Sequence, residues 1–315
     1  MSVQASTKVI ALCVTFEPDT ERLQRALSAI AAQADGVLVL DNSVSETAQA
    51  AVVTLANETQ HTSYVGLWGN VGLGAAYNQG VEMARVQAAD YVLLLDQDSI
   101  VADDMLVRLL AIFQQAPDPD TAEAARDAIA ACGPRYVDRL TGRRSVMLGE
   151  RGFSMGRLPE PSATTECSPS AMLISSGSLI PLSVIDRLGP FDEDFFIDHI
   201  DTDFCLRARA QQMRLLVVSA AGMEHELGHA HQRLWWWGWR ELPVHPPLRL
   251  YYIFRNSLRL MARPYAHWRW RLFDVRRLAV ILAVHLVAPG ARLARLGNAA
   301  SGFLAGIRGQ TGPKS

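Results

Sequence analysis

A short apolar run with acidic residues directly after it is the feature that most constrains the fold of this chain. The run is Tyr91–Leu95, and Asp96-Gln97-Asp98-Ser99 follows it at once. Such a run, with β-branched and aromatic members and polar borders, is typical of a fully buried strand. Open α/β sheets hold their ligands at the carboxyl ends of strands, where two carboxylates suit a hard divalent cation. For this short motif alone, a solvated turn is the alternative.

The N-terminal part of the chain alternates predicted strands with predicted helices. The predicted strands are Val9–Thr15, 37–40 and 62–65, and the predicted helices are 20–34 and 72–85. This alternation predicts a mainly parallel sheet with helices on both faces. Residues 116–127 and 141–170 contain few apolar runs and are predicted as loops, the second long enough to cover a site.

Composition sets the class of protein. The chain has 315 residues, 49% of them hydrophobic, which is enough for one large α/β domain with an appendage or for two domains. The four cysteines are far apart and form no C-x-x-C pair, which favours a reducing compartment over a disulfide framework or a zinc site. They are Cys13, Cys132, Cys167 and Cys205. The N-terminus lacks the basic start and apolar core of a signal peptide.

Charge is distributed unevenly along the chain. Residues 1–232 contain 16 basic and 30 acidic residues, a net charge of −14, whereas residues 233–315 contain 14 basic and 2 acidic residues, a net charge of +12. Six of the seven tryptophans also lie in the second segment. Arginine with tryptophan favours a segment that rests on an anionic membrane, with a helix over 273–287 presenting Leu278, Ile281 and Leu282. The alternative is a basic helical subdomain packed on the acidic body.

Two segments near the predicted strands are candidates for nucleotide contacts. Asp41 follows the strand 37–40 and can accept a hydrogen bond from a base or a ribose, although an Asp in this position also caps turns. The segment Asn70–Gly80 brings small residues to the start of a helix, whose free N–H groups suit a diphosphate. It is not the dinucleotide-binding fingerprint.

A segment rich in acids and phenylalanine follows Ser175–Ile180. Five aspartates lie between residues 192 and 203 among apolar neighbours, and partly buried carboxylates have raised pKa values that suit a general base. Capping of the helix predicted over 201–209 accounts for one of these acids. Glu224 and His225 follow at a predicted strand end, where the histidine completes a metal site or lies in a surface loop.

In this order, these segments resemble the family 2 glycosyltransferases of the GT-A fold, and within them the rhamnosyltransferase-like members. The resemblance covers about Val9 to Asn256. The segments are Thr15-Phe16-Glu17-Pro18, Asp41-Asn42-Ser43, Asn70–Gly80, Asp96-Gln97-Asp98-Ser99, Ser176-Gly177-Ser178-Leu179, Phe195-Phe196-Ile197-Asp198, Asp201-Thr202-Asp203, His225-x-Leu227-Gly228 and Tyr251-Tyr252-x-x-Arg255-Asn256. Glu17 differs from the asparagine that such proteins often have before the proline, which affects a local nucleotide contact.

The resemblance implies roles for individual residues. Asp96 and Asp98 are the metal-binding pair, His225 completes the metal shell, and the cation is Mg²⁺ or Mn²⁺. Asp201 is the general base in a single displacement that inverts the anomeric centre. The implied nucleotide-sugar contacts are Thr15, Asp41, Asn70, Gly72, Asn78, Gln97 and Arg255, the last of these on a diphosphate. The implied acceptor or sugar region contains Ser176, Gly177, Asp198 and Asp203.

We therefore expect an inverting, metal-dependent glycosyltransferase. A GT-A catalytic domain over 1–232 has a nucleotide-sugar half (about 1–100) and an acceptor and base half (about 130–232), and a basic helical segment over 233–315 follows. The expected donor is dTDP-L-rhamnose, and the acceptor is a lipid-linked or polysaccharide glycan of the cell envelope. The expected location is the cytoplasmic face of the membrane, with a homo-oligomer left open.

Alternative functions are a galactofuranosyl- or hexosyltransferase with another donor and an inactive sugar-nucleotide-binding protein. A nucleotidyltransferase is disfavoured, because the chain lacks a phosphate loop rich in glycine and lysine. Nucleic acid is not an expected partner, because no recognised binding motif accompanies the basic charge.

Overall fold

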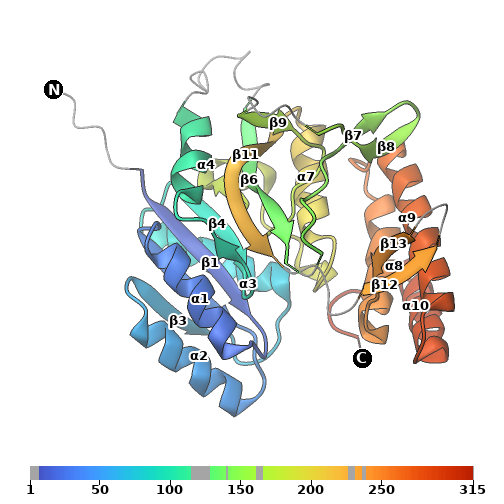
Figure 1. Cartoon of the computed structure of the whole chain (residues 1–315), viewed down its shortest axis with the longest axis horizontal. Coiled ribbons are helices and arrows are strands. Elements are labelled where there is room, and N and C mark those ends of the chain that lie inside the picture. Colours follow the sequence, from blue (N-terminus) through green and yellow to red (C-terminus); the bar gives the residue numbers. More distant parts are fainter. Residues whose placement is uncertain are drawn as a thin grey trace.

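A nine-stranded mixed sheet forms the centre of the molecule (Figure 1). The computed structural model describes residues 7–114, 128–139, 141–160, 166–225, 231–235 and 239–314, with the backbone alone for 231–235 and 239–243. The strand order is β3-β2-β1-β4-β10-β6-β11-β5, and β9 pairs with β11. The strands are β1 (Val9–Thr15), β2 (Gly36–Asp41), β3 (Thr62–Gly66), β4 (Tyr91–Asp96), β5 (Ile100–Val101), β6 (Ile129–Asp138), β9 (Cys167–Pro169), β10 (Leu179–Pro181) and β11 (Arg214–His225).

The first four strands along the chain are parallel, as the sequence predicts. In this half of the sheet, Thr15 pairs with Asp41 and Val14 pairs with Asp96, so the polar carboxyl ends of β1, β2 and β4 line up at one edge. The short strand β10 runs antiparallel between β4 and β6. Beyond it, β6 and β11 are again parallel to each other. The chain therefore brings its strand-end carboxylates to one edge of the sheet.

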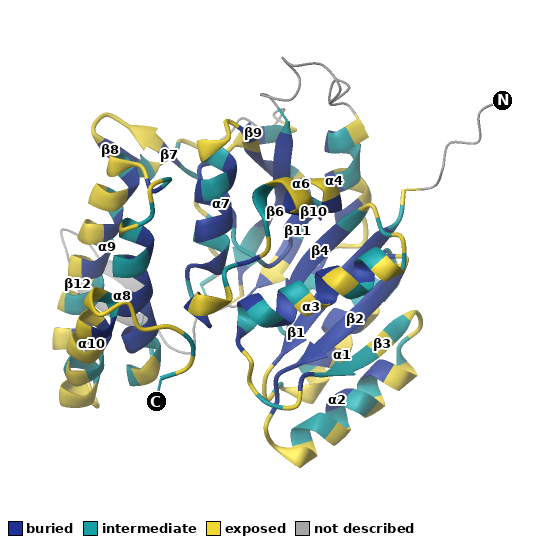
Figure 2. Ribbon diagram, turned by 180° about the vertical axis from the view of Figure 1, so that it is seen from behind, coloured by how far each residue is buried: buried dark blue, intermediate teal, exposed yellow. Residues whose placement is uncertain are grey.

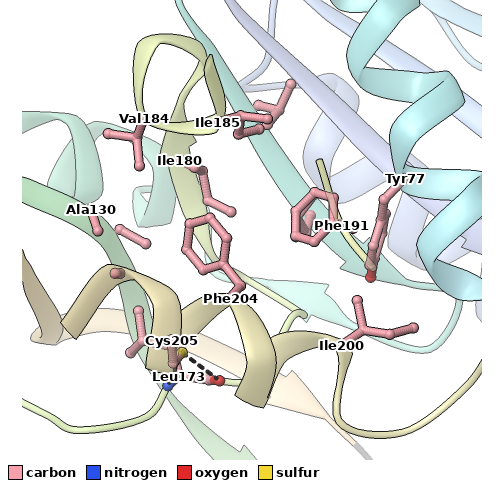
Figure 3. Packing of buried hydrophobic residues seen from close by; sticks show 14 of the residues in the cluster. Tyr77, Ala130, Leu173, Ile180, Val184, Ile185, Phe191, Ile200, Phe204 and Cys205 are labelled. Carbon is pink, nitrogen blue, oxygen red and sulfur yellow. Dashed lines mark hydrogen bonds between the residues drawn. The ribbon is translucent and has the colours of Figure 1, made fainter. Parts of the chain in front are cut away.

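Helices cover both faces of the sheet because alternate residues of each strand point to opposite sides. Val9 and Ala11 pack with α1, α2 and α4 on one face, while Ile10 and Leu12 pack with α3 on the other. The core that contains Ile10 and Leu12 also contains residues of α6 and α7. Figure 3 shows Phe191 and Phe204 of this core beside Ile180. The helices are α1 (Thr20–Ala31), α2 (Glu46–Glu58), α3 (Leu73–Val86), α4 (Met105–Gln114), α6 (Leu182–Leu188), the 3-10 turn η1 (Glu193–Phe195) and α7 (Ile200–Ala210).

The prediction of a loop over 141–170 is wrong in part. A hairpin of β7 (Leu148–Arg151) and β8 (Ser154–Arg157) forms there, and β9 adds to the main sheet. Short strands with isolated apolar residues give no clear periodicity, so their pairing is set by neighbours distant in the sequence. Of the other predicted loop, 116–127, all residues lie outside the described part of the chain.

Three helices follow the body and pack on one another. They are α8 (Pro247–Met261), α9 (Trp268–Val287) and α10 (Arg292–Ile307), and a hairpin of β12 (His231–Trp235) and β13 (Trp239–Pro243) precedes them. Leu278 of α9 is buried with residues of α8 and α10, and Ile281 and Leu282 pack against the same cluster. The face of α9 that contains Leu278, Ile281 and Leu282, which we predicted to rest on a membrane, is therefore internal, because it forms the core of this helical unit. Trp236 and Trp237 lie outside the described residues.

Arginines of the C-terminal segment pair with the acidic body. Arg259 contacts Asp194 at 2.9 Å and Arg249 contacts Asp198 at 3.0 Å, while Arg263 pairs with Asp192 and Arg269 with Glu150. Part of the charge asymmetry in the sequence thus reflects an internal contact. Among the helices of the described residues, none has the length and apolarity that crossing a bilayer requires. The domain boundary at residue 232 stays a prediction.

Candidate active site

Two aspartates and a histidine meet at the carboxyl edge of the sheet. Asp96 ends β4, Asp98 follows in the turn, and His225 ends β11. Antiparallel pairing of β11 with β5 brings the histidine to this turn. One ligand atom from each of the three residues lies within 4.8 Å of the other two. A cluster of two carboxylates and an imidazole fits a Mn²⁺ or Mg²⁺ ion that keeps open positions for phosphate oxygens.

The imidazole of His225 is held in a defined orientation. Its Nδ1 lies 2.9 Å from the Ser99 hydroxyl and 3.3 Å from Asp98, and its Nε2 lies 3.8 Å from Asp96 Oδ2. A partner on one ring nitrogen is the usual way in which proteins orient a metal-binding histidine. Burial lowers the pKa of His225, but the hydrogen bond with Asp98 and the charges of both aspartates outweigh it and raise the pKa overall. These surroundings attract positive charge.

The Ser176 hydroxyl supports the same cluster. It accepts a hydrogen bond from the Asp96 amide at 3.1 Å and lies 2.6 Å from the Ser99 hydroxyl. Gly177 follows with φ +83°, and a Cβ there would lie 2.5 Å from the ring of Pro134. The structure therefore gives Ser176 and Gly177 a role in shaping the carboxyl end of β4, and their predicted contact with a sugar stays a prediction.

Asp201 lies in the first turn of α7 and lines a cavity beside the cluster. Its carboxylate accepts hydrogen bonds from the Thr202 amide at 2.7 Å and from the Thr202 hydroxyl at 3.3 Å. Removal from water, together with the charges of Asp198 and Asp96, raises the pKa of Asp201 to about 6, against the opposing hydrogen bonds of Thr202. A carboxylate of this pKa is suited to accept a proton near neutral pH.

The loop before α7 has a strained backbone. Phe196, Asp198 and His199 all have φ between 63° and 67°, a region that residues other than glycine seldom adopt. Such strain persists only where neighbouring structure holds it and is frequent at functional sites. Here the Asn256 amide group donates to the carbonyls of Phe195, Ile197 and Asp198 at 2.7–3.2 Å.

Arg255 is engaged with the protein itself, and its predicted contact with a diphosphate stays a prediction. The side chain is fully buried, and its guanidinium donates to the backbone carbonyls of Phe195, Asp194 and Gly312. Its Nε donates to Asn256 Oδ1 at 2.9 Å. Both residues of this Arg-Asn pair therefore hold the strained loop, because fork-shaped and amide donors can bind several carbonyls at once.

Asp203 contacts other residues of the protein, and its predicted place in the acceptor or sugar region stays a prediction. It is fully buried, forms an ion pair with Arg207 at 2.7 Å and accepts a hydrogen bond from Tyr265. It does not line the cavity that contains Asp201. Two residues further along a helix point to a different side, which is why Asp203 supports packing while Asp201 lines the cavity.

The predicted phosphate cradle at the start of α3 is occupied by the protein itself. The Leu73 amide donates to the Phe196 carbonyl at 2.7 Å, and a Cβ on Gly72 would lie 2.7 Å from the same carbonyl oxygen. The Asn78 side chain bonds both the amide and the carbonyl of Phe191. Gly72 and Asn78 thus hold the acidic segment in place, and the expected contact of these two residues with a donor stays a prediction.

The remaining predicted donor contacts lie near the strand ends. The Thr15 hydroxyl donates to Asp41 Oδ1 at 2.8 Å, and both residues are buried, so this pair ties β1 to β2. Gln97 accepts a hydrogen bond from the Phe16 amide at 2.7 Å, and Asn70 is exposed and accepts one from the Gly72 amide. Contacts of these four residues with a nucleotide stay predictions.

Two residues at this site, Arg249 and His199, were not predicted from the sequence. Arg249 pairs with Asp198, and its charge also interacts with Asp96 and Asp201. His199 is buried beside Ser257 and Arg277. A signal for Arg249 exists, since it lies seven residues before Asn256 and therefore on the same helix face. His199 has no comparable signal, because its neighbours come from α8 and α9.

Comparisons with known proteins agree with this architecture. Residues 10–178 match the sequence model of a family described as glycosyl transferase family 2. The chain is 25% identical over 261 residues to the dTDP-rhamnosyl transferase RfbF of Shigella flexneri, which covers 82% of this chain and 81% of that protein.

Solved structures show the same fold at low identity. The crystal structure of S. aureus TarS 1–349 superposes with a TM-score of 0.53 at 16% identity, covering 96% of this chain and 81% of that one. GalNAc-T7, solved with UDP, GalNAc and Mn²⁺, gives a TM-score of 0.58 at 16% identity, covering 96% of this chain and 56% of that one. The match over residues 10–178 covers more than half of the chain, which therefore belongs to glycosyl transferase family 2 and has the GT-A fold.

Proposed function

We propose that this glycosyltransferase moves L-rhamnose from dTDP-L-rhamnose to a hydroxyl group of a glycan acceptor, with inversion at the anomeric carbon. One observation carries the proposal: a possible metal site and a carboxylate of raised pKa lie close enough for the charge of Asp96 to act on Asp201. The similarity to RfbF of Shigella flexneri supports the choice of donor. TarS solved with UDP-GlcNAc supports a nucleotide sugar as the donor class.

In this proposal, Asp96, Asp98 and the Nε2 atom of His225 hold a divalent cation. Bound there, Mn²⁺ or Mg²⁺ supplies positive charge that neutralises the leaving diphosphate. Neutralisation matters because an unmatched charge is costly in a site of low dielectric constant. Ser99 holds the other ring nitrogen of His225, and Ser176 holds the strand end.

Asp201 acts on the acceptor side. It accepts the proton of the acceptor hydroxyl while that oxygen attacks the anomeric carbon, and the bond from this carbon to the diphosphate oxygen breaks. A single displacement of this kind inverts the anomeric configuration and needs no protein nucleophile. Arg249 and Asp198 balance each other's charge beside the base.

A donor panel tests the proposal. Release of nucleoside diphosphate is measured for dTDP-rhamnose, UDP-galactose, UDP-galactofuranose and UDP-GlcNAc, with Mn²⁺, with Mg²⁺ and with EDTA. We expect release from dTDP-rhamnose that depends on the cation, and its loss in Asp96→Asn and Asp98→Asn. Glu82→Gln, which changes an exposed carboxylate on α3, is the matched control. Preference for another donor replaces the rhamnosyl assignment, and full activity in EDTA overturns the metal assignment.

Membrane contact is proposed for the outer face of α9. Its exposed apolar residues recur along the helix while Leu278 faces inward; they are Trp268, Leu272, Val275, Val280, Leu286 and Val287. Residues 275–315 contain no aspartate or glutamate. A second copy of this face would bring like charges together, whereas an anionic lipid surface is complementary to an apolar and basic helix. Figure 2 shows exposed residues along this side of α9.

Sedimentation with vesicles tests this contact. The protein is expected to sediment with vesicles that contain phosphatidylglycerol and not with neutral ones, and less so at high salt. Val275→Glu, 53% exposed before the change, reduces binding, whereas Val107→Glu, at a site 63% exposed on α4, leaves binding unchanged. If Val275→Glu and Val107→Glu sediment equally with vesicles, α9 is not the membrane contact. If the protein binds anionic and neutral vesicles equally, the contact is not electrostatic.

A further inference from the structure

A cavity of about 330 Å³ lies between the body and the C-terminal helices, next to Asp201. One wall comes from the body, with Tyr136 and Met147, and the opposite wall comes from α9, with Trp270, Phe273, Asp274 and Arg277. Figure 1 shows α9 beside the β7–β8 hairpin at this junction. The size is that of a small-molecule site.

Two buried polar atoms at this cavity have no partner among the described residues. They are Asp274 Oδ2 and His199 Nδ1, on side chains that are 1% and 8% exposed. Buried polar atoms in proteins are nearly always hydrogen-bonded, so an unpaired acceptor and an unpaired ring nitrogen at one cavity point to a ligand. The other polar atoms of both residues are used: Asp274 Oδ1 accepts from Arg277 Nε at 2.6 Å, and His199 Nε2 lies 2.7 Å from an Arg277 terminal nitrogen.

The arrangement fixes which atoms are offered to a ligand. A guanidinium donates only, so His199 Nε2 is the acceptor and the ring proton is on Nδ1. Burial and the neighbouring Arg277 lower the pKa of His199 to about 4, which keeps the ring neutral. The unpaired groups in the wall of this cavity are therefore one N–H donor and one carboxylate acceptor, beside the Asp201 carboxylate.

The charges at this cavity disfavour an anionic ligand. Arg277 pairs with Asp274 and Arg249 pairs with Asp198, while His199 is neutral and Asp201 forms no ion pair among the described residues. The remaining charge is negative, which disfavours a phosphate. Trp270, Phe273 and Tyr136 add aromatic surface, and a combination of aromatic faces with a few convergent polar groups suits a neutral ring that carries hydroxyl groups.

We propose that this cavity binds the acceptor as a neutral sugar ring, and that Asp274 and Arg277 of α9 and His199 of the α7 loop determine which sugar fits. The inference rests on the proposed function and extends it, because it makes the C-terminal helices part of the acceptor site. Any charged lipid phosphate of the acceptor then lies outside the cavity.

The experiment uses the full chain with dTDP-rhamnose and Mn²⁺. Methyl glycosides of rhamnose, galactose, glucose and N-acetylglucosamine are the neutral probes, and decyl phosphate is the anionic one. We expect at least one glycoside to accelerate dTDP release over the slow hydrolysis by water, and decyl phosphate to leave it unchanged. Acceleration by decyl phosphate alone overturns the assignment of a neutral ligand, as does hydrolysis that no glycoside accelerates.

Neighbouring arginines provide matched variants. Arg277 holds the Asp274 carboxylate and the His199 ring in place, so Arg277→Gln is expected to raise the KM of the accelerating glycoside at least about tenfold, the usual effect of losing one hydrogen bond to a charged group. Arg276→Gln, one residue away on the exposed side of α9, is expected to behave as the wild type. Met147→Trp fills the cavity from the other wall and raises the same KM without touching the Arg277 network.

The outcomes separate the two proposals. If dTDP release persists while Arg277→Gln and Met147→Trp both keep the wild-type KM, the cavity is not the acceptor site and the transferase function stands. If no donor is hydrolysed and no glycoside is modified, the proposed function itself fails. Circular dichroism of each variant shows whether it is folded, and Met147→Trp decides the question if Arg277→Gln unfolds.

Discussion

The pH dependence of transfer tests the role of Asp201 most directly. Its pKa of about 6 means that the carboxylate is mostly ionised at pH 7 and mostly protonated at pH 5. A base must be ionised to accept a proton, so kcat/KM is expected to fall as pH decreases through 6. From the two ionised fractions, about 90% and about 10%, the expected loss between pH 7 and pH 5 is roughly tenfold. An ordinary aspartate, with a pKa of about 3.9, would give almost no change over this range.

Two variants should move this acid limb in opposite directions. The Asp198 charge raises the pKa of Asp201, so Asp198→Asn should shift the limb to lower pH. Arg249 is a nearby cation that favours ionised Asp201, so Arg249→Gln should shift the limb to higher pH. Asparagine also tolerates the φ of +64° at residue 198, which limits the disturbance of the backbone.

The assay is initial-rate dTDP release across pH 4.5–8 at saturating Mn²⁺, since His225 must lose its proton before it binds a metal. Asp201→Asn should lower transfer at pH 7 by at least about 100-fold, the usual contribution of a positioned base. A flat profile in the wild type between pH 5 and pH 7, or shifts of both variants in the same direction, would refute the assignment of the base.

Three further predictions follow from packing and burial. Arg255→Lys should lower kcat and the melting temperature, because Arg255 holds the loop before α7 through hydrogen bonds to backbone carbonyls, and the donor KM should stay within about twofold. A raised donor KM with unchanged kcat would instead indicate that Arg255 contacts the diphosphate of the donor. Gly302→Ala should destabilise the protein by about 1–3 kcal/mol, since its Cβ would lie 2.2 Å from the Tyr251 carbonyl oxygen, whereas Gly297→Ala on the same helix meets nothing and should be neutral or stabilising in thermal melts. His199 has a pKa of about 4 in the folded state and about 6.5 in the unfolded state, so only the unfolded state gains a proton as pH falls from 6.5 to 4, and the free energy of unfolding should decrease by up to about 3 kcal/mol. His199→Asn should lose less stability over this range, and an equal loss would contradict the burial argument.

Local patterns in the sequence were sufficient for the parallel half of the sheet. Strands such as Val9–Thr15 and Tyr91–Asp96 are apolar on both faces, and this property depends only on neighbouring residues. Because parallel strands end at one edge, the position of Asp96 and Asp98 at a shared site followed from the same patterns. The mixed half was harder, since β10 and the β7–β8 hairpin are short and pair with distant segments.

The tertiary structure alone decided which charged residue meets which. Arg249, Arg255 and Arg259 lie on one helix, yet they contact Asp198, backbone carbonyls and Asp194 respectively. Likewise, Asp201 and Asp203 are two residues apart, and one lines the cavity while the other is buried against Arg207 and Tyr265. Composition shows that opposite charges are present in two segments. The partner of each charge depends on helix rotation and on the packing of α8 and α9 against the body, which are contacts between residues far apart in the chain.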